Sequence, residues 1–354
     1  MTMTSKERFS RIYRHKDPDR VGMTESPWST TIARWRREGM PEDADIKEYF
    51  GLDEIVGVSV DNSPQYPATV IEETDEYSIT AGAWGGTVKN WKRQTSTPEH
   101  IDFTIVDRES WAKAKERMHP TPDRINWEDL EKSYRDGLDQ GAWIVAAGWF
   151  GYDITASHVI GTEQMLIAMA EDPDWCRDMF EHGLDVDLAL FDMIIDKGYS
   201  FDCLDFPDDL GYRNGLFFSP EMYRRVVKPV HKRAFDWAHE RGMVTMLHSC
   251  GNIMEAIPDL IDAGLDGLNP IETKAGMDLI GIKDKFGDDL VLQGGIDVRL
   301  MNKPDKIEDE IRTKVTHAMK DGGYIFHSDH SVPDDVSLED YKRVIELVKK
   351  YGTY

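Results

Sequence analysis

Short apolar runs alternate with longer amphipathic stretches along most of the chain. Eight runs are rich in the apolar and β-branched residues that favour buried strands, and turn residues or charged residues border most of them. They are RVGMT (20–24), IVGVSVD (55–61), AWIVAAG (142–148), FDCLDF (201–206), MVTMLHS (243–249), DGLNPI (266–271), LVLQGGI (290–296) and GYIFHSD (323–329). The pattern predicts eight strands.

Helical periodicity fills most of the intervals between the later runs. The predicted helical segments are 162–198, 219–242, 253–264, 277–287 and 306–323. Each ends in the glycine that is favoured just beyond a helix C-terminus. A steady strand, helix, strand order indicates parallel strands joined by crossovers. Eight such units predict an α/β fold, a (β/α)₈ TIM barrel of about 250 residues, which leaves roughly 100 of the 354 residues for insertions.

Residues 65–103 have a different pattern. Alternating polar and apolar residues, β-formers and a Gly-Gly turn predict an antiparallel β insertion between the second and third barrel strands. We expect this segment to form a lid or an interface element. Because no linker rich in Pro, Gly or Ser divides the chain, residues 1–354 are predicted to form a single barrel domain with this N-terminal insertion.

Composition and charge exclude several classes of protein. Hydrophobic residues at 40% and charged residues at 31% are values of a globular protein. Even the longest apolar stretches, such as AWIVAAGWFG, are too short to cross a bilayer. The first twenty residues lack the apolar core of a signal peptide, so we expect a cytoplasmic protein. A formal charge of −24 without a basic, aromatic-studded stripe argues against nucleic acid as a partner.

Chemistry in a barrel of this kind is expected at the C-terminal ends of the strands. An acidic ring with histidines and a cysteine at that mouth suits a divalent cation better than an anion. The polar and aromatic residues that close the eight runs are Glu25, Trp28, Asp61, Asn62, Tyr152, Asp153, Asp205, Asp208, Asp209, His248, Cys250, Asn269, Glu272, Gln293, Asp297, His327, Asp329 and His330.

The stretch TMLHSCGN (245–252) carries the most distinctive candidate. Side chains alternate along a strand, so His248 and Cys250 point the same way, roughly 7 Å apart along an extended chain and closer at a turn. Zinc binds thiolate and imidazole, and a catalytic site uses three protein ligands. A third ligand must then come from elsewhere, and the last strand offers His330, with His327 and Asp329 as substitutes. The alternative is a buried thiol beside a hydrogen-bonded histidine.

Several segments carry a family resemblance. They are DDLGYRNGLFFSPEMYRRVVKPVHKR, HSCGNIMEAIPDLIDAGLDGLNPIE, LVLQGGIDVRLM and GGYIFHSDHSVPDDVSLEDYKRVIELVKKYG, with TIARWRREGMPE and YFGLDEI nearer the N-terminus. With them the chain resembles the uroporphyrinogen decarboxylase-like superfamily, and especially its corrinoid-dependent zinc methyltransferase branch. The metal pattern of that branch, His-x-Cys followed much later by a cysteine, maps onto His248, Cys250 and His330. The histidine at the third position is a departure from the pattern.

The resemblance implies a zinc enzyme that takes a methyl group from a methoxylated small molecule, such as an aryl methyl ether, and transfers it to the cobalt of a corrinoid (cobalamin). It implies catalytic roles for acidic residues, with Asp153, Asp209 and Glu25 as candidate proton donors and Asp61 matching the active-site aspartate of the decarboxylases. The predicted substrate-binding residues are Trp28, Trp149, Tyr152, Phe206, Asn269 and Glu272.

The sequence also bears on partners. The chain lacks an Asp-x-His-x-x-Gly run of the kind that holds a corrinoid's lower ligand, so the corrinoid is expected on a separate protein, with residues 65–103 as part of the docking surface. Homodimers are frequent in this superfamily, and we expect neither a nucleic acid nor a membrane partner.

Other readings of the resemblance stay open. Decarboxylation of a polycarboxylate porphyrinogen is disfavoured, because Glu25 and Trp28 stand where that reaction needs arginines. A metal-free decarboxylase or lyase acting on a smaller acid is one alternative. A thiol-directed corrinoid methyltransferase and a non-enzymatic module that binds a corrinoid or tetrapyrrole are the others.

Overall fold

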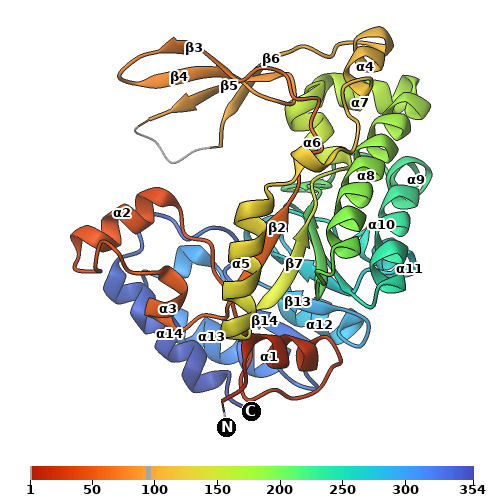
Figure 1. Ribbon diagram of the computed structural model, residues 1–354. Coiled ribbons are helices and arrows are strands. Elements are labelled where there is room, and N and C mark those ends of the chain that lie inside the picture. Colours follow the sequence, from red (N-terminus) through yellow and green to blue (C-terminus); the bar gives the residue numbers. More distant parts are fainter. Residues whose placement is uncertain (1, 93–96) are drawn as a thin grey trace.

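Eight parallel strands form the centre of the molecule (Figure 1). The structure is a computed structural model that describes residues 2–92 and 97–354. The strands are β1 Gly22–Met23, β2 Ile55–Ser59, β7 Trp143–Ala147, β8 Cys203–Pro207, β11 Val244–His248, β12 Gly267–Asn269, β13 Val291–Gln293 and β14 Tyr324–Phe326. Each falls in one of the eight predicted runs, only β8 passing its run's end, by Pro207.

The strands follow the order β1-β14-β13-β12-β11-β8-β7-β2, and every neighbouring pair is parallel. The predicted α/β barrel-like fold is therefore confirmed. In the described part of the chain no strand ladder joins β1 to β2. Asp53, just before β2, connects these two ends of the sheet instead: its N–H donates to the Met23 carbonyl (2.8 Å), and its carboxylate accepts the Met23 N–H (2.7 Å).

Helices cover the outside of the sheet and occupy all five predicted helical segments. Predicted segment 162–198 forms two helices, because Asp172 ends the first and its side chain caps the second. Among the described residues, no helix combines the length and apolar character that a bilayer span requires. The helices are α1 Ser5–Ile12, α2 Ser29–Arg37, α3 Ile46–Phe50, α4 Arg108–Lys115, α5 Trp127–Gln140, α6 Tyr152–Ile154, α7 Thr162–Glu171, α8 Pro173–Asp196, α9 Pro220–Met222, α10 Lys228–Glu240, α11 Ile257–Ala263, α12 Leu279–Phe286, α13 Pro304–Ala318 and α14 Leu338–Tyr351.

The predicted antiparallel insertion is also confirmed. It forms a four-stranded sheet of β3 Thr69–Glu73, β4 Tyr77–Ala81, β5 Gly86–Trp91 and β6 Glu99–Phe103. In Figure 1 this sheet stands at the end of the barrel opposite α1 and the two termini. The insertion thus lies at the end that carries the C-termini of the barrel strands.

The alternation of side chains explains how the barrel interior changes from apolar to polar. Near α1 the interior is a buried cluster of Phe9, Ile12, Trp143, Val145, Cys203, Met246, Val291 and Ile325. Two residues further along β8 and β11, the same inward-facing rows reach Asp205 and His248. Burial raises the pKa of Asp205 to about 6, although the nearby His248 lowers this pKa in part. The barrel interior is therefore filled by apolar side chains near α1 and lined by polar side chains at the opposite end.

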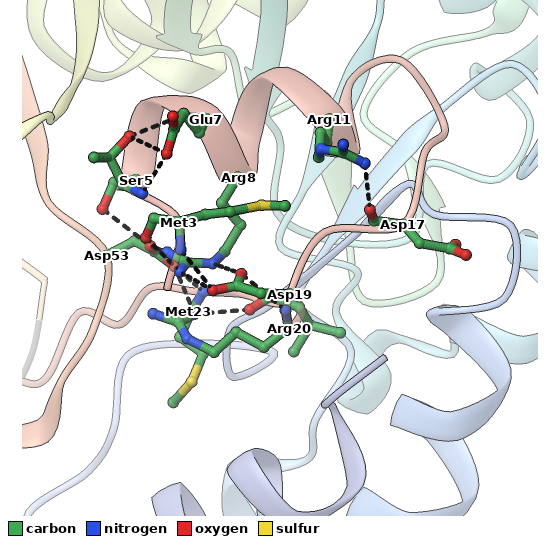
Figure 2. Close-up of polar contacts among 12 residues, drawn as sticks. Met3, Ser5, Glu7, Arg8, Arg11, Asp17, Asp19, Arg20, Met23 and Asp53 are labelled. Atoms are coloured by element: carbon green, nitrogen blue, oxygen red, sulfur yellow. Dashed lines mark hydrogen bonds and ion pairs between the residues drawn. The ribbon is translucent and has the colours of Figure 1, made fainter. Parts of the chain in front are cut away.

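A buried ion-pair network fixes α1 to this closed end (Figure 2). Asp53 forms ion pairs with Arg8 and with Arg20 (2.8 Å), and its carboxylate also accepts from the Ser5 hydroxyl (3.0 Å). Arg8 also pairs with Asp19 (2.8 Å) and is only 2% exposed. Although burial opposes it, hydrogen bonding to Arg8 lowers the pKa of Asp19 to about 2. The network joins α1, β1 and the segment before β2.

We expect Asp53→Asn to lower the free energy of unfolding by about 3 kcal/mol, because it removes one of the two carboxylates that pair with the buried Arg8, while Asp19 remains as the other. The adjacent Glu54→Gln is the matched control: it removes a partly exposed pair with Lys47, for which about 1 kcal/mol or less is expected. Urea denaturation followed by circular dichroism measures both. Equal losses in the two variants would contradict a special role for Asp53.

Candidate metal centre

Three potential metal ligands meet at the mouth of the barrel. One ligand atom from each of Asp209, His248 and Cys250 lies within 4.8 Å of the other two. The Cys250 sulfur is 3.4 Å from His248 Nε2, and that nitrogen is 3.9 Å from Asp209 Oδ1. All three side chains belong to residues of intermediate exposure. Nitrogen, sulfur and carboxylate oxygen are therefore within reach of a single ion.

Two adjacent strands bring this group together. His248 ends β11, which pairs in parallel with β8, and Asp209 follows the end of β8. Beyond the strands the pairing continues, since the Asp208 N–H donates to the His248 carbonyl (2.8 Å). Asp209 Oδ1 then accepts the Cys250 N–H (2.7 Å), which fixes the carboxylate against the turn that carries the thiol.

A hydrogen bond from the next strand orients His248. Its Nδ1 lies 2.5 Å from the Asn269 side-chain oxygen, and the two residues are register partners on β11 and β12. An amide oxygen only accepts, so Nδ1 carries the proton and Nε2 presents its lone pair to Asp209 and Cys250. This is the arrangement by which outer-shell groups orient metal-binding histidines.

The turn after the strand holds Cys250 in a half-buried position. Burial raises the pKa of the Cys250 thiol, and the carboxylates of Asp209 and Glu272 add to this effect. The thiol is therefore protonated at neutral pH unless a cation displaces the proton. Gly251 follows at φ +85°, and a β-carbon there would overlap the Gly211 backbone, which explains why glycine follows the cysteine.

Two further carboxylates lie beside the group. Burial raises the pKa of Asp153 to about 7, and the carboxylates of Asp209 and Asp208 contribute in the same direction. Asp208 is fully buried: it accepts the Asp153 N–H (2.6 Å) and faces His231 Nε2 (2.8 Å). Asp208 thus positions the Asp153 backbone, while Asp153 is suited to hold a proton near neutral pH.

His231 was not among the site residues predicted from the sequence. It lies on α10, and its other ring nitrogen faces the Tyr223 hydroxyl at 3.1 Å. Both residues are completely buried. The residue contributes nothing to the strand pattern, so only the packing of α10 against the barrel reveals its contact with Asp208.

The structure places His330 outside the group of three. Its ring faces Trp28, with ring centroids 6.2 Å apart. Burial, the nearby Lys274 and, more weakly, His248 lower the pKa of His330. β14 lies three strands away from β11 in the sheet, whereas β8 is its direct neighbour. Asp209 therefore completes the group of close ligands, and a role for His330 at the metal stays a prediction.

Two predicted acids are engaged in local structure. Glu25 has a fully buried side chain, accepts from the Ser328 hydroxyl (2.5 Å) and lies 3.6 Å from His327. Asp61 accepts from the Ser63 and Gln65 side chains, and these hydrogen bonds lower its pKa although burial opposes them. Neither carboxylate belongs to the group around Cys250, and their catalytic roles stay predictions.

The predicted aromatic residues are distributed among several environments. Trp149 packs against Trp84 and His158, with ring centroids 6.3 and 5.0 Å away, which connects the insertion to the barrel end. Tyr152 is buried against the rings of Phe217 and Phe218. Phe206 is also buried, and packs outward against Phe150, His231 and Phe235. Phe206 is thus part of the core between sheet and helices.

Asn269 and Glu272, predicted to bind substrate, make contacts that support the group. Asn269 orients His248, while Glu272 accepts the Gly251 N–H (2.5 Å) and pairs with Lys274 (3.2 Å). A pocket of about 390 Å³ opens beside them, with Cys250 and Glu272 in its lining. This volume falls in the range of small-molecule sites.

Comparisons with known proteins agree with the fold. The uroporphyrinogen decarboxylase (URO-D) family matches residues 152–351, more than half of the chain. A uroporphyrinogen decarboxylase from Vesicomyosocius okutanii is 24% identical over 144 residues, which are 40% of this chain and 39% of that protein. The chain thus aligns with well under half the length of this relative. A methyltransferase from Methanosarcina mazei has a similar structure, with a TM-score of 0.66, 17% identity and 99% of each chain covered.

The Asn269 contact gives a testable prediction. We expect Asn269→Ala to weaken Zn²⁺ binding by about 10–100-fold, because His248 then loses the group that fixes its orientation. Competition with a chromophoric chelator measures the affinity. Asn62→Ala is the control, since it removes a side-chain bond to the Trp149 carbonyl elsewhere on the rim and leaves His248 untouched. An equal effect of both substitutions would argue against a specific orienting contact.

Proposed function

Because the chain belongs to the uroporphyrinogen decarboxylase (URO-D) family, we propose that it is a zinc-dependent methyltransferase built on that family's barrel. In this proposal it removes the methyl group of a methoxylated small molecule, such as an aryl methyl ether. A corrinoid carried by a separate protein accepts the group. The observation that carries the proposal is the meeting of Asp209, His248 and Cys250 beside an open pocket.

The donor set fits zinc. Imidazole nitrogen, thiolate sulfur and carboxylate oxygen are all common zinc ligands, and three protein ligands leave a position for substrate. His248 already presents Nε2 through its bond to Asn269. Asp209 and Cys250 supply the other two donors, and His330 is the candidate for an additional or substitute ligand. The M. mazei methyltransferase of similar fold supports this choice of reaction class.

In the proposed reaction, the bond between the methyl carbon and oxygen breaks, and the departing oxygen needs a proton. When bound, zinc would supply Lewis-acid chemistry that makes this oxygen a better leaving group. Asp153 holds a proton near neutral pH because burial and the neighbouring carboxylates raise its pKa to about 7. Asp208 keeps Asp153 in place through the backbone N–H. A positioned acid of this kind typically contributes about 10²–10⁴-fold in rate.

The insertion is the proposed docking surface for the corrinoid protein. It stands at the mouth end of the barrel (Figure 1). Val70 and Ile71 on β3 are 66% and 61% exposed, and Ile101 on β6 is 45% exposed. Exposed apolar residues of this kind are typical of surfaces that contact other proteins.

A metal-free decarboxylase of a smaller acid is the second candidate. The V. okutanii relative, described as a uroporphyrinogen decarboxylase, favours it. This candidate gives no account of the hydrogen bond that directs His248 Nε2 toward a thiol and a carboxylate.

Metal analysis separates the two candidates. We expect about one zinc ion per chain in the parent protein and a large loss in Asp209→Ala, His248→Ala and Cys250→Ala. Binding should release about one proton per ion and weaken as pH falls, because the Cys250 thiol must be deprotonated. Elemental analysis and calorimetry in buffers of different ionisation enthalpy measure both. Cys176→Ala, at a buried cysteine of α8, is the control. A parent that binds no zinc would refute the proposal, and His330→Ala shows whether that residue is a ligand.

A methyl-transfer assay tests the proposed role of Asp153 as proton donor. With a reduced corrinoid and a methoxylated aromatic donor, we expect Asp153→Asn to lower kcat by about 100-fold or more while zinc content is retained. Asp139→Asn, on the exposed side of α5, controls for the loss of one surface carboxylate. Activity of Asp153→Asn close to that of the control would exclude Asp153 as proton donor.

A further inference from the structure

The pocket beside Cys250 contains basic side chains in an otherwise strongly acidic protein. Its lining includes Arg213, Lys274 and Arg299 and only one carboxylate, Glu272. The whole chain carries a formal charge of −24. We propose that this pocket is an anion subsite and that the methyl donor is a carboxylic acid. The identification of the bound acid as the methyl donor rests on the proposed function.

The three cations differ in how their charge is balanced. Lys274 pairs with Glu272 at 3.2 Å, and Arg299 makes two bonds to Asp297 at 2.8 and 2.7 Å. Arg213 is exposed, and no carboxylate in the described part of the chain forms an ion pair with it. Its guanidinium is therefore free to receive two oxygens of a carboxylate in parallel.

The backbone keeps Arg213 at a fixed place relative to the thiol. Arg213 lies in the turn of a hairpin formed by β9 Gly211–Tyr212 and β10 Gly215–Leu216. The Tyr212 carbonyl accepts the Asn252 N–H (2.8 Å), and the Gly211 and Gly251 backbones are in close contact. The hairpin is thus joined to the turn that carries Cys250, which places the Arg213 backbone at a fixed position beside the thiol.

Electrostatics explain why an acidic donor needs these cations. An anion approaching a protein with a formal charge of −24 is repelled at long range. A local group of cations lowers this barrier at one place only. A neutral ether has no need of an unpaired arginine, whereas a carboxylate pairs with it and is turned with its other end toward Cys250.

Equilibrium binding with a matched ligand pair tests the subsite. The probes are 4-methoxybenzoate and 4-methoxybenzamide, which share size and methoxy group and differ in charge. We expect the parent to bind the acid at least about tenfold more tightly than the amide, and this preference to shrink as ionic strength rises. Arg213→Gln should weaken acid binding by about tenfold or more and leave amide binding unchanged. Arg225→Gln, at an exposed arginine outside the pocket, should change neither affinity.

The titrations are run on both chelator-treated and Zn²⁺-treated protein. The test of the anion subsite can then be read whether or not the protein binds zinc. A preference for the acid that depends on Arg213 supports the anion subsite even in protein that binds no zinc, a result that would refute only the metal-dependent function. Equal affinity for acid and amide, absence of binding by both, or an unchanged affinity in Arg213→Gln would overturn the subsite.

Discussion

The parallel pairing of β8 with β11 is the constraint on which the candidate site depends. The ladder sets Asp205 opposite Met246 and Pro207 opposite His248, so the two strands end together at the mouth. The chain then turns away in both places, and Asp209 meets the Cys250 backbone. A shift of one residue in this register would turn His248 out of the barrel interior and separate the donors.

The mouth concentrates negative charge in a partly buried place. Burial raises the pKa of Asp153, Asp205 and Asp209, so part of this charge is neutralised by protons in the metal-free protein. A bound divalent cation also neutralises this negative charge, and its binding releases protons from its ligands. The same physics makes the basic pocket beside Cys250 informative, because Arg213 in its lining forms an ion pair with none of the carboxylates in the described part of the chain.

The two ends of the barrel differ in their contribution to stability and to the candidate site. At the α1 end, the ion pairs of Arg8 and Asp53 (Figure 2) and an apolar cluster hold the sheet together where the described residues form no ladder between β1 and β2. At the other end, turns and hairpins carry polar groups that contribute little to the core. Substitutions at the first end are therefore expected to act on stability, and those at the second end on binding and rate.

The sequence by itself determined the barrel, the antiparallel insertion and the pairing of His248 with Cys250. These depend on local periodicity: apolar runs of strand length, helical stretches between them, and the two-residue repeat that points residues 248 and 250 the same way. The same repeat turns Phe206, next to the inward-facing Asp205, toward the helices, where it packs against Phe150, His231 and Phe235, and its contact with substrate stays a prediction.

Only the tertiary structure decided which distant groups join that pair. His330 was the predicted third ligand, with His327 and Asp329 as substitutes, and Asp209 was predicted only as a proton donor. In the structure β8, which leads to Asp209, borders β11, while β14 lies three strands away, and strand order is not encoded in the spacing of residues along the chain. Asn269 behind His248, His231 beneath Asp208 and Arg213 in the pocket likewise follow from packing between elements. Contacts of this kind depend on which strands and helices pack against one another. The periodicity within one segment does not specify which other segments lie beside it in the fold.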